Sequence, residues 1–74
     1  MATSEEKLKR LEEIEGMEPI EMAKSALTDG TCPGICMNDD CEYTTDVEPD
    51  QDKGWCDECQ QNTVKSVVML LGVI

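Results

Sequence analysis

Residues 36–59 read CMNDDCEYTTDVEPDQDKGWCDEC, and a close pair of cysteines stands at each end of this stretch. Four residues separate Cys36 from Cys41, two separate Cys56 from Cys59, and fourteen lie between the pairs. This spacing is typical of a tetrahedral site with four sulfur ligands, because cysteines so close in sequence can reach one ion from a single turn. We therefore expect these four thiolates to bind Zn²⁺.

The cysteine pattern leaves other assignments open. A fifth cysteine, Cys32, could replace Cys36 as a ligand, because the segment between them also suits a turn. Iron bound by four thiolates, as in a rubredoxin, has the same spacing. A disulfide framework is disfavoured by the odd cysteine count and by the lack of an apolar secretory segment at the start. A thioredoxin-type redox motif at Cys56 and Cys59 would need a larger fold.

The chain is short and strongly acidic. It has 74 residues, with six basic and seventeen acidic side chains and a formal net charge of −11. A domain of this size buries a small fraction of its surface, so we expect a metal ion to act as its staple. The charge argues against direct nucleic-acid binding, which normally requires a basic surface. It favours contact with a basic protein surface or a role in solubility alone.

Two short helices are predicted at the start of the chain. Apolar residues recur at helical spacing behind a capping box that starts at Thr3, which predicts a helix over residues 4–15. Pro19 in the first turn and a closing Asp-Gly pair predict a second helix over residues 18–28. We assign residues 1–30 to an N-terminal helical region.

Residues 31–74 are expected to form the zinc ribbon, packed with the helices into one compact domain. Residues 31–35 read as a connector. Two β-rich segments, 42–47 and 54–55, flank a turn and predict a hairpin with a cysteine pair at each base. Residues 62–66 add a third strand. The predicted fold class is a small α+β protein, a metal-stapled zinc ribbon of two to three short antiparallel strands preceded by two short helices.

The apolar end of the chain, residues 67–74, is too short to span a bilayer. Its pattern does not decide between helix and strand. Residues 63–65 suit a strand, so we expect a strand that leads into a short helix or an extended segment. An exposed tail of this kind would aggregate. We therefore expect it to pack on the ribbon or the helices, or to pair with a second copy in a homodimer.

Several runs in the C-terminal half carry a resemblance. They are PGICMN (33–38), CEYTT (41–45), EPDQ (48–51), GWCDEC (54–59) and NTV (62–64). Together they resemble short, uncharacterised zinc-ribbon-like proteins of bacteria and their phages. The resemblance implies ligands at Cys36, Cys41, Cys56 and Cys59, whereas the position of Cys32 is often a non-cysteine in that group. The first pair is sometimes closer there than here. The resemblance implies a cytoplasmic bacterial or phage origin and no particular activity.

Three classes of function are compatible with these patterns. The first is a non-catalytic module that binds another protein, because a closed four-thiolate site leaves no position for a substrate. Its best contact candidate is the acidic turn 48–52 beside Trp55, unless Trp55 packs beneath an ordinary solvated turn.

The second class is an acidic DNA mimic that inhibits a nucleic-acid enzyme. The third is a rubredoxin-like electron carrier or a thiol enzyme with Cys32 as its spare thiol. We expect the first, with no enzymatic activity and no membrane association.

Overall fold

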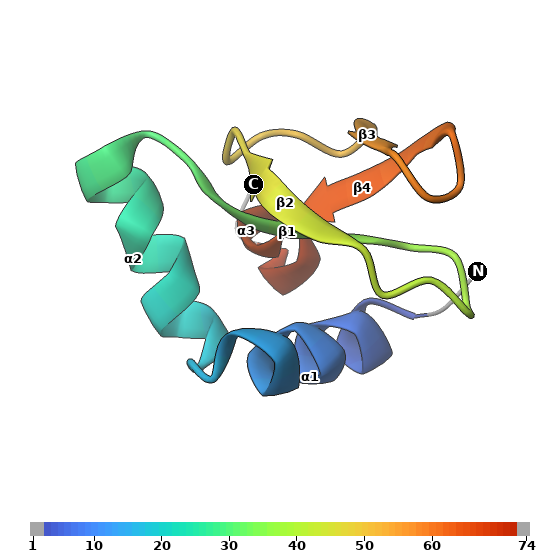
Figure 1. The fold of residues 1–74 in the computed structure, drawn as a ribbon. Helices are drawn as coiled ribbons and strands as arrows, with labels where there is room; N and C mark the ends of the chain where they lie inside the picture. The colour runs from blue at the N-terminus through green and yellow to red at the C-terminus, as the bar shows by residue number, and fades with distance from the viewer. Residues whose placement is uncertain (1–2, 73–74) are drawn as a thin grey trace.

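The computed structural model describes residues 3–72, and within this range three helices pack with a four-stranded antiparallel sheet (Figure 1). The helices are α1 (Ser4–Glu15), α2 (Pro19–Asp29) and α3 (Val67–Leu71). The strands are β1 (Cys32–Cys36), β2 (Thr44–Val47), β3 (Gly54–Cys56) and β4 (Gln61–Ser66), in the sheet order β2-β1-β4-β3. The predicted fold class, a small α+β protein with two N-terminal helices, is confirmed.

Local signals in the sequence delimit both N-terminal helices. The Thr3 hydroxyl accepts a hydrogen bond of 3.2 Å from the Glu6 amide, and the Glu6 carboxylate reaches back to the Thr3 amide at 3.5 Å. Gly16 ends α1 with a φ of 70°, a left-handed conformation that glycine adopts without a steric penalty. Pro19 opens α2. The helix predicted over residues 4–15 is confirmed, and the second prediction was displaced by one residue.

The sheet contradicts the predicted hairpin and the predicted connector. Strands β2 and β3, which we expected to pair, lie at opposite edges, with β1 and β4 between them. Strand β1 is formed by the segment that we read as a connector because of Pro33 and Gly34. Pro33 is tolerated because its register partner is on β2 only, while pairing with β4 starts at Gly34. A Cβ on Gly34 would lie 2.8 Å from the Val47 side chain, so glycine permits this close approach of strands.

Strand β4 and helix α3 follow one another without a loop. The predicted strand over residues 62–66 is confirmed with one extra residue, Gln61. Ser66 then caps α3, because its hydroxyl accepts a hydrogen bond from the Met69 amide at 3.1 Å and donates one to the Pro49 carbonyl at 2.6 Å. The apolar end is thus helical over residues 67–71 and follows a strand directly, which is one of the two arrangements that we expected; residues 73–74 lie outside the described range.

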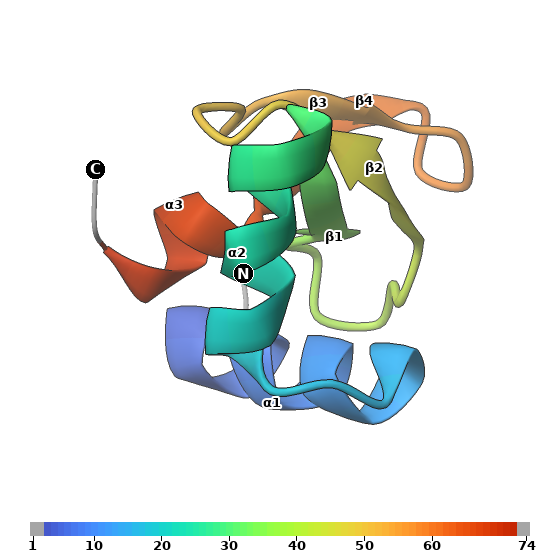
Figure 2. The same cartoon turned by 90° about the vertical axis from the view of Figure 1, so that its left-hand side faces the viewer.

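The main core lies between the helices and the sheet (Figures 1 and 2). Its fully buried members Leu11, Met22, Ile35 and Val67 come from α1, α2, β1 and α3 respectively. The next residue in β1 is Cys36, and its side chain points to the opposite face of the strand from that of Ile35. It belongs to a second, smaller cluster that contains further cysteines.

Candidate metal centre

Four sulfur atoms converge on this smaller cluster. The Sγ atoms of Cys36, Cys41, Cys56 and Cys59 all lie within 4.8 Å of one another. Cys36 Sγ lies 3.8 Å from Cys59 Sγ, and Cys41 Sγ lies 3.6 Å from Cys56 Sγ. A tetrahedral ion with sulfur ligands about 2.3 Å away holds its sulfurs about 3.8 Å apart. The observed spacing fits such an ion, and these four cysteines are the ones that the sequence analysis selected.

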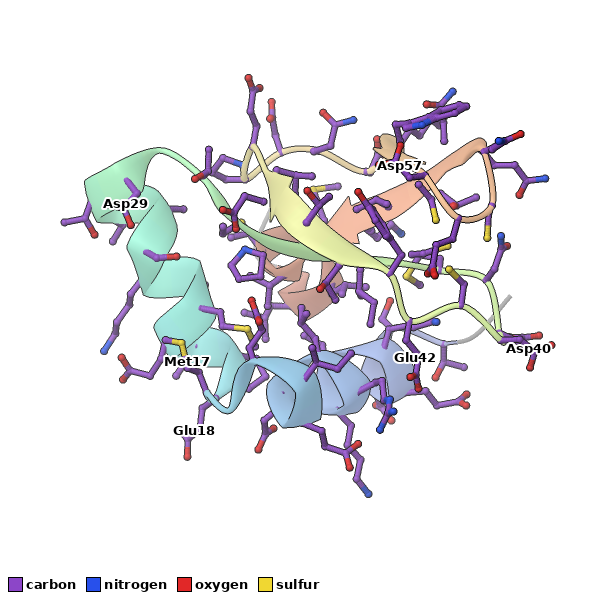
Figure 3. The ribbon with its side chains drawn as sticks, in the orientation of Figure 1. Met17, Glu18, Asp29, Asp40, Glu42 and Asp57 are labelled. Carbon is purple, nitrogen blue, oxygen red and sulfur yellow. The ribbon has the colours of Figure 1, made fainter. Side chains whose placement is uncertain are left out.

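The strands bring the two cysteine pairs together. Cys36 ends β1 and Cys56 ends β3, and both strands pair with β4, where Val64 is the register partner of both Cys36 and Gly54. The two remaining cysteines of the cluster, Cys41 and Cys59, lie in the turns that follow. Figure 3 shows sulfur atoms gathered between the segments that carry the labelled Asp40 and Asp57. The sheet order that overturned the predicted hairpin is therefore what assembles the site.

The second turn is shaped around a sulfur atom. The Cys59 amide donates a hydrogen bond of 3.3 Å to Cys56 Sγ, and the Gln60 amide donates one of 2.7 Å to the Cys56 carbonyl. Gln60 has a φ of 55°, the one positive φ among the described non-glycine residues. An uncommon backbone conformation of this kind is tolerated where the surroundings fix it. Here it returns the chain from the cysteine pair into β4.

Polar side chains from other elements also reach the sulfurs. The Thr63 hydroxyl lies 3.0 Å from Cys36 Sγ, within hydrogen-bond distance. The Asn38 side-chain amide donates to Cys59 Sγ at 3.2 Å. Groups that hydrogen-bond metal ligands orient them and stabilise their charged form. Sequence reasoning missed both residues. Asn38 lies between the two cysteines of the first pair, and Thr63 directly precedes the buried residue Val64 in β4.

Burial and hydrogen bonds shift the pKa values of three thiols in the cluster. Burial raises the pKa of Cys41 and that of Cys56 above the usual value for a thiol. Burial acts in the same direction on Cys36, but hydrogen bonds from Thr63 and from the backbone of Asn38 outweigh it and lower its pKa to about 7. Because a metal binds the thiolate, an ion that enters this site must displace protons from Cys41 and Cys56 at neutral pH.

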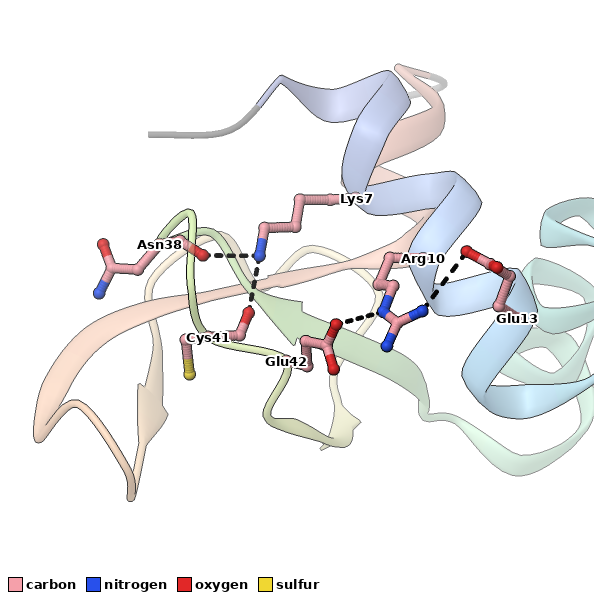
Figure 4. Close-up of polar contacts among 6 residues, drawn as sticks. All are labelled: Lys7, Arg10, Glu13, Asn38, Cys41 and Glu42. Carbon is pink, nitrogen blue, oxygen red and sulfur yellow. Dashed lines mark hydrogen bonds and ion pairs between the residues drawn. The ribbon is translucent and has the colours of Figure 1, made fainter.

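The first cysteine turn is held by a buried lysine of α1. Lys7 is only 4% exposed, and its Nζ donates hydrogen bonds of 2.6 Å to the Asn38 carbonyl and 2.7 Å to the Cys41 carbonyl (Figure 4). Burial of an ammonium group is costly unless the group is hydrogen-bonded. The two carbonyls therefore compensate the desolvation of Lys7. A divalent ion with four thiolates, whose net charge is about −2, would stabilise it further.

Lys7 was not among the predicted site residues. The signal was present, because Lys7 precedes the fully buried Leu11 by four residues and so shares the buried face of α1. Arg10, one turn from Lys7, forms an ion pair with Glu42, the residue after Cys41 (Figure 4). Its guanidinium lowers the pKa of Glu42. Helix α1 therefore presents two cations to the turn that carries a predicted ligand.

One side of the sulfur cluster faces solvent. Cys41 and Cys59 are half-buried, whereas Cys36 and Cys56 are fully buried. An open hollow of about 470 Å³ borders the two half-buried cysteines, and Asp39, Asp40 and Glu58 contribute to its wall. Small ions and chelators therefore have a route to the cluster. The acidic wall favours cations over anions along that route.

The remaining cysteine and the lone tryptophan lie elsewhere. Cys32 is 1% exposed and belongs to the main core with Leu11 and Ile35, so the structure does not bring it to the sulfur cluster. Trp55 lies on the edge strand β3 and is 52% exposed, so about half of its surface is accessible to solvent. Nearby, the Tyr43 hydroxyl donates a hydrogen bond of 3.1 Å to the Asp57 carboxylate.

Four clustered cysteines with this geometry could hold a metal ion. Because every ligand position of a tetrahedral ion would be filled by sulfur, the arrangement is that of a structural site. None of the helices formed by residues 3–72 has the length and apolarity needed to cross a membrane. Comparisons of the chain with protein-family models, with curated proteins and with solved structures give no match, so the resemblance to bacterial and phage proteins stays a prediction.

Proposed function

We propose that this chain is a non-catalytic zinc-ribbon protein, in which a structural Zn(Cys)₄ site holds the fold and the acidic surface binds another protein. The observation that carries the proposal is the convergence of the four sulfur atoms, with separations of 3.6 and 3.8 Å that suit tetrahedral coordination. Zinc is the usual ion for a closed four-thiolate site. Cys36, Cys41, Cys56 and Cys59 would hold it.

The size of the protein supports a structural role for the ion. Among residues 3–72, the small cluster that contains the sulfurs has three fully buried members, which are Cys36, Cys56 and Val64. Structural zinc contributes on the order of 10 kcal/mol in comparable small domains, which rivals the whole stability of a typical protein. The ion would therefore fix the two turns and the sheet end that apolar packing alone holds weakly.

Charge supports a protein partner rather than a nucleic acid. The chain has a formal net charge of −11, and a zinc ion with four thiolates makes the folded protein more negative still. Phosphate backbones would be repelled, whereas a basic protein surface would be attracted. Exposed apolar side chains such as Trp55 and Leu27 supply contact area of the kind that protein interfaces bury.

Elemental analysis of the purified protein, followed by chelation, tests the metal part of this proposal. We expect one zinc ion per chain, a colourless solution, and loss of the far-ultraviolet circular-dichroism signal of the fold when a strong chelator removes the ion. Recovery of the signal on addition of zinc is the matched control. A red, redox-active protein with stoichiometric iron would favour the electron-carrier alternative. A fold that persists without metal would overturn the structural role.

A further inference from the structure

We propose that the groove between α2 and α3 is the docking site for a basic amphipathic helix of another protein. This inference rests on the interaction role proposed above and gives it a surface and a partner chemistry. The groove encloses about 310 Å³. Its apolar walls come from three parts of the chain, with Ile20, Ala23 and Leu27 on α2, Pro49 on the connection between β2 and β3, and Val68 on α3.

Helix α2 buries one apolar side in the core and leaves two large apolar residues of another side exposed, although Ala23 between them also packs against the core. Met22 is fully buried in the main core, whereas Ile20 is 53% exposed and Leu27 is 90% exposed. Ile20, Ala23 and Leu27 have the i, i+3, i+7 spacing of a single helical face. Figure 2 looks onto α2, with α3 beside it and no other element in front of it.

The shape of the groove suits a helix as the occupant. The exposed face of α2 from Ile20 to Leu27 covers two turns, which is about 10 Å along the helix axis. A row of side chains at i, i+3, i+4 and i+7 on a second helix matches such a ridge and would bury both large apolar residues. Pro49 and Val68 form the opposite wall and would fix the position of that helix.

Acidic residues near the groove favour a basic partner. Glu48 and Asp50, on either side of Pro49, are both exposed. The cation that lines the groove, Lys24, forms an ion pair of 3.5 Å with Glu21. A second copy of this chain would bring its own −11 charge and a second acidic rim to the interface, which like-charge repulsion disfavours. A helix with lysine or arginine beside its apolar stripe meets complementary charge.

Titration calorimetry with a synthetic peptide tests this inference. The probe is a helix-forming peptide of about 14 residues, with leucines at i, i+3, i+4 and i+7 and lysines between them. We expect zinc-loaded protein to bind it, and Leu27→Gln or Ile20→Gln to weaken binding at least about tenfold. Ile14→Gln replaces an exposed apolar residue outside the groove and should leave binding unchanged. A scrambled peptide and one with glutamate in place of lysine should both bind at least about tenfold more weakly.

Other outcomes would overturn the inference. Equal binding of the lysine and glutamate peptides would contradict the charge argument. A dimer in sedimentation equilibrium that Leu27→Gln dissociates would assign the groove to a second copy. Tighter peptide binding after removal of residues 73–74 would assign the groove to the end of the chain itself.

Zinc content and circular dichroism are measured on the same sample. A zinc-loaded, folded protein that ignores the peptide contradicts the groove alone, whereas a metal-free protein contradicts the zinc site.

Discussion

Lys7 Nζ donates a hydrogen bond of 2.7 Å to the main-chain oxygen of Cys41, which lies 34 residues further along the chain. The same ammonium group reaches the Asn38 carbonyl, so one side chain of α1 spans the turn between the first two predicted ligands. Helix α1 is therefore connected directly to the candidate metal centre. Metal binding and docking of this helix should depend on one another.

Replacement of Lys7 by methionine tests that connection. The change keeps the apolar stem but removes the charged donor to two part-buried carbonyls, of which the Asn38 carbonyl still accepts a hydrogen bond from the Cys41 amide. We therefore expect a loss of about 2–3 kcal/mol in the free energy of unfolding. Zinc affinity should fall about 10- to 100-fold, as it does when groups that support metal ligands are removed. Competition with a chromophoric chelator and denaturant unfolding measure the two effects.

The matched control is Lys9→Met, because Lys9 lies on the exposed side of the same helix. It should change neither quantity appreciably. Lys7→Arg keeps the charge and the donors but adds bulk at a buried position, so we expect a partial effect. Equal zinc affinities for Lys7→Met and Lys9→Met would show that α1 does not support the metal centre.

A cysteine series tests the ligand assignment. Cys59→Ser should abolish stoichiometric zinc binding and unfold the protein, because three thiolates remain where four are needed. Cys32→Ala removes one buried sulfur from the main core, so we expect a cost of about 1–2 kcal/mol with zinc binding retained. Metal analysis and thermal unfolding distinguish the two results. Loss of zinc in Cys32→Ala together with retention in Cys36→Ala would instead show that Cys32 is the ligand.

Glycine at position 34 is predicted to be essential to the central strand. Its backbone lies so near its neighbours that a Cβ would be 3.0 Å from the Lys65 carbonyl as well as 2.8 Å from Val47. We expect Gly34→Ala to lower the free energy of unfolding of the zinc-loaded protein by about 1–3 kcal/mol, a typical cost of overpacking. Val47→Ala in the same chain should recover part of this loss. A neutral Gly34→Ala would show that β1 and β2 can move apart freely.

Position 34 also shows where prediction from the sequence stops. Cysteine spacing and helix caps are local signals, and they located the sulfur cluster and both N-terminal helices correctly. Pro33 and Gly34 are also local signals, and they predict a turn. Close packing against Val47 and Lys65, which are distant in sequence, instead makes this segment a central strand. The pairing of β4 with both β1 and β3 is equally non-local, so the hairpin prediction had no means of anticipating it.

Metal affinity should fall steeply with acidification. The pKa of Cys41 and that of Cys56 are raised by burial, so both thiols are protonated at neutral pH in the metal-free protein. Each proton that zinc displaces makes the apparent dissociation constant about tenfold larger per pH unit of acidification, so these two protons alone give about 100-fold. Cys36, with a pKa of about 7, adds to this dependence at the acidic end of the range. Chelator competition between pH 6 and pH 8 measures the slope. A flat profile would contradict the participation of these two thiols.

Thr63 is predicted to stabilise the thiolate of Cys36. Its hydroxyl lies 3.0 Å from Cys36 Sγ and helps to lower the pKa of that thiol to about 7. Thr63→Val keeps the shape of the side chain but removes the hydrogen bond, so the pKa of Cys36 should rise and protons should compete better with the metal. We expect zinc affinity at pH 7 to fall about tenfold. The midpoint of acid-induced zinc release should move to higher pH.

Thr31→Val, at an exposed position outside the sulfur cluster, is the control. An unchanged midpoint in Thr63→Val would show that the hydroxyl does not stabilise the Cys36 thiolate.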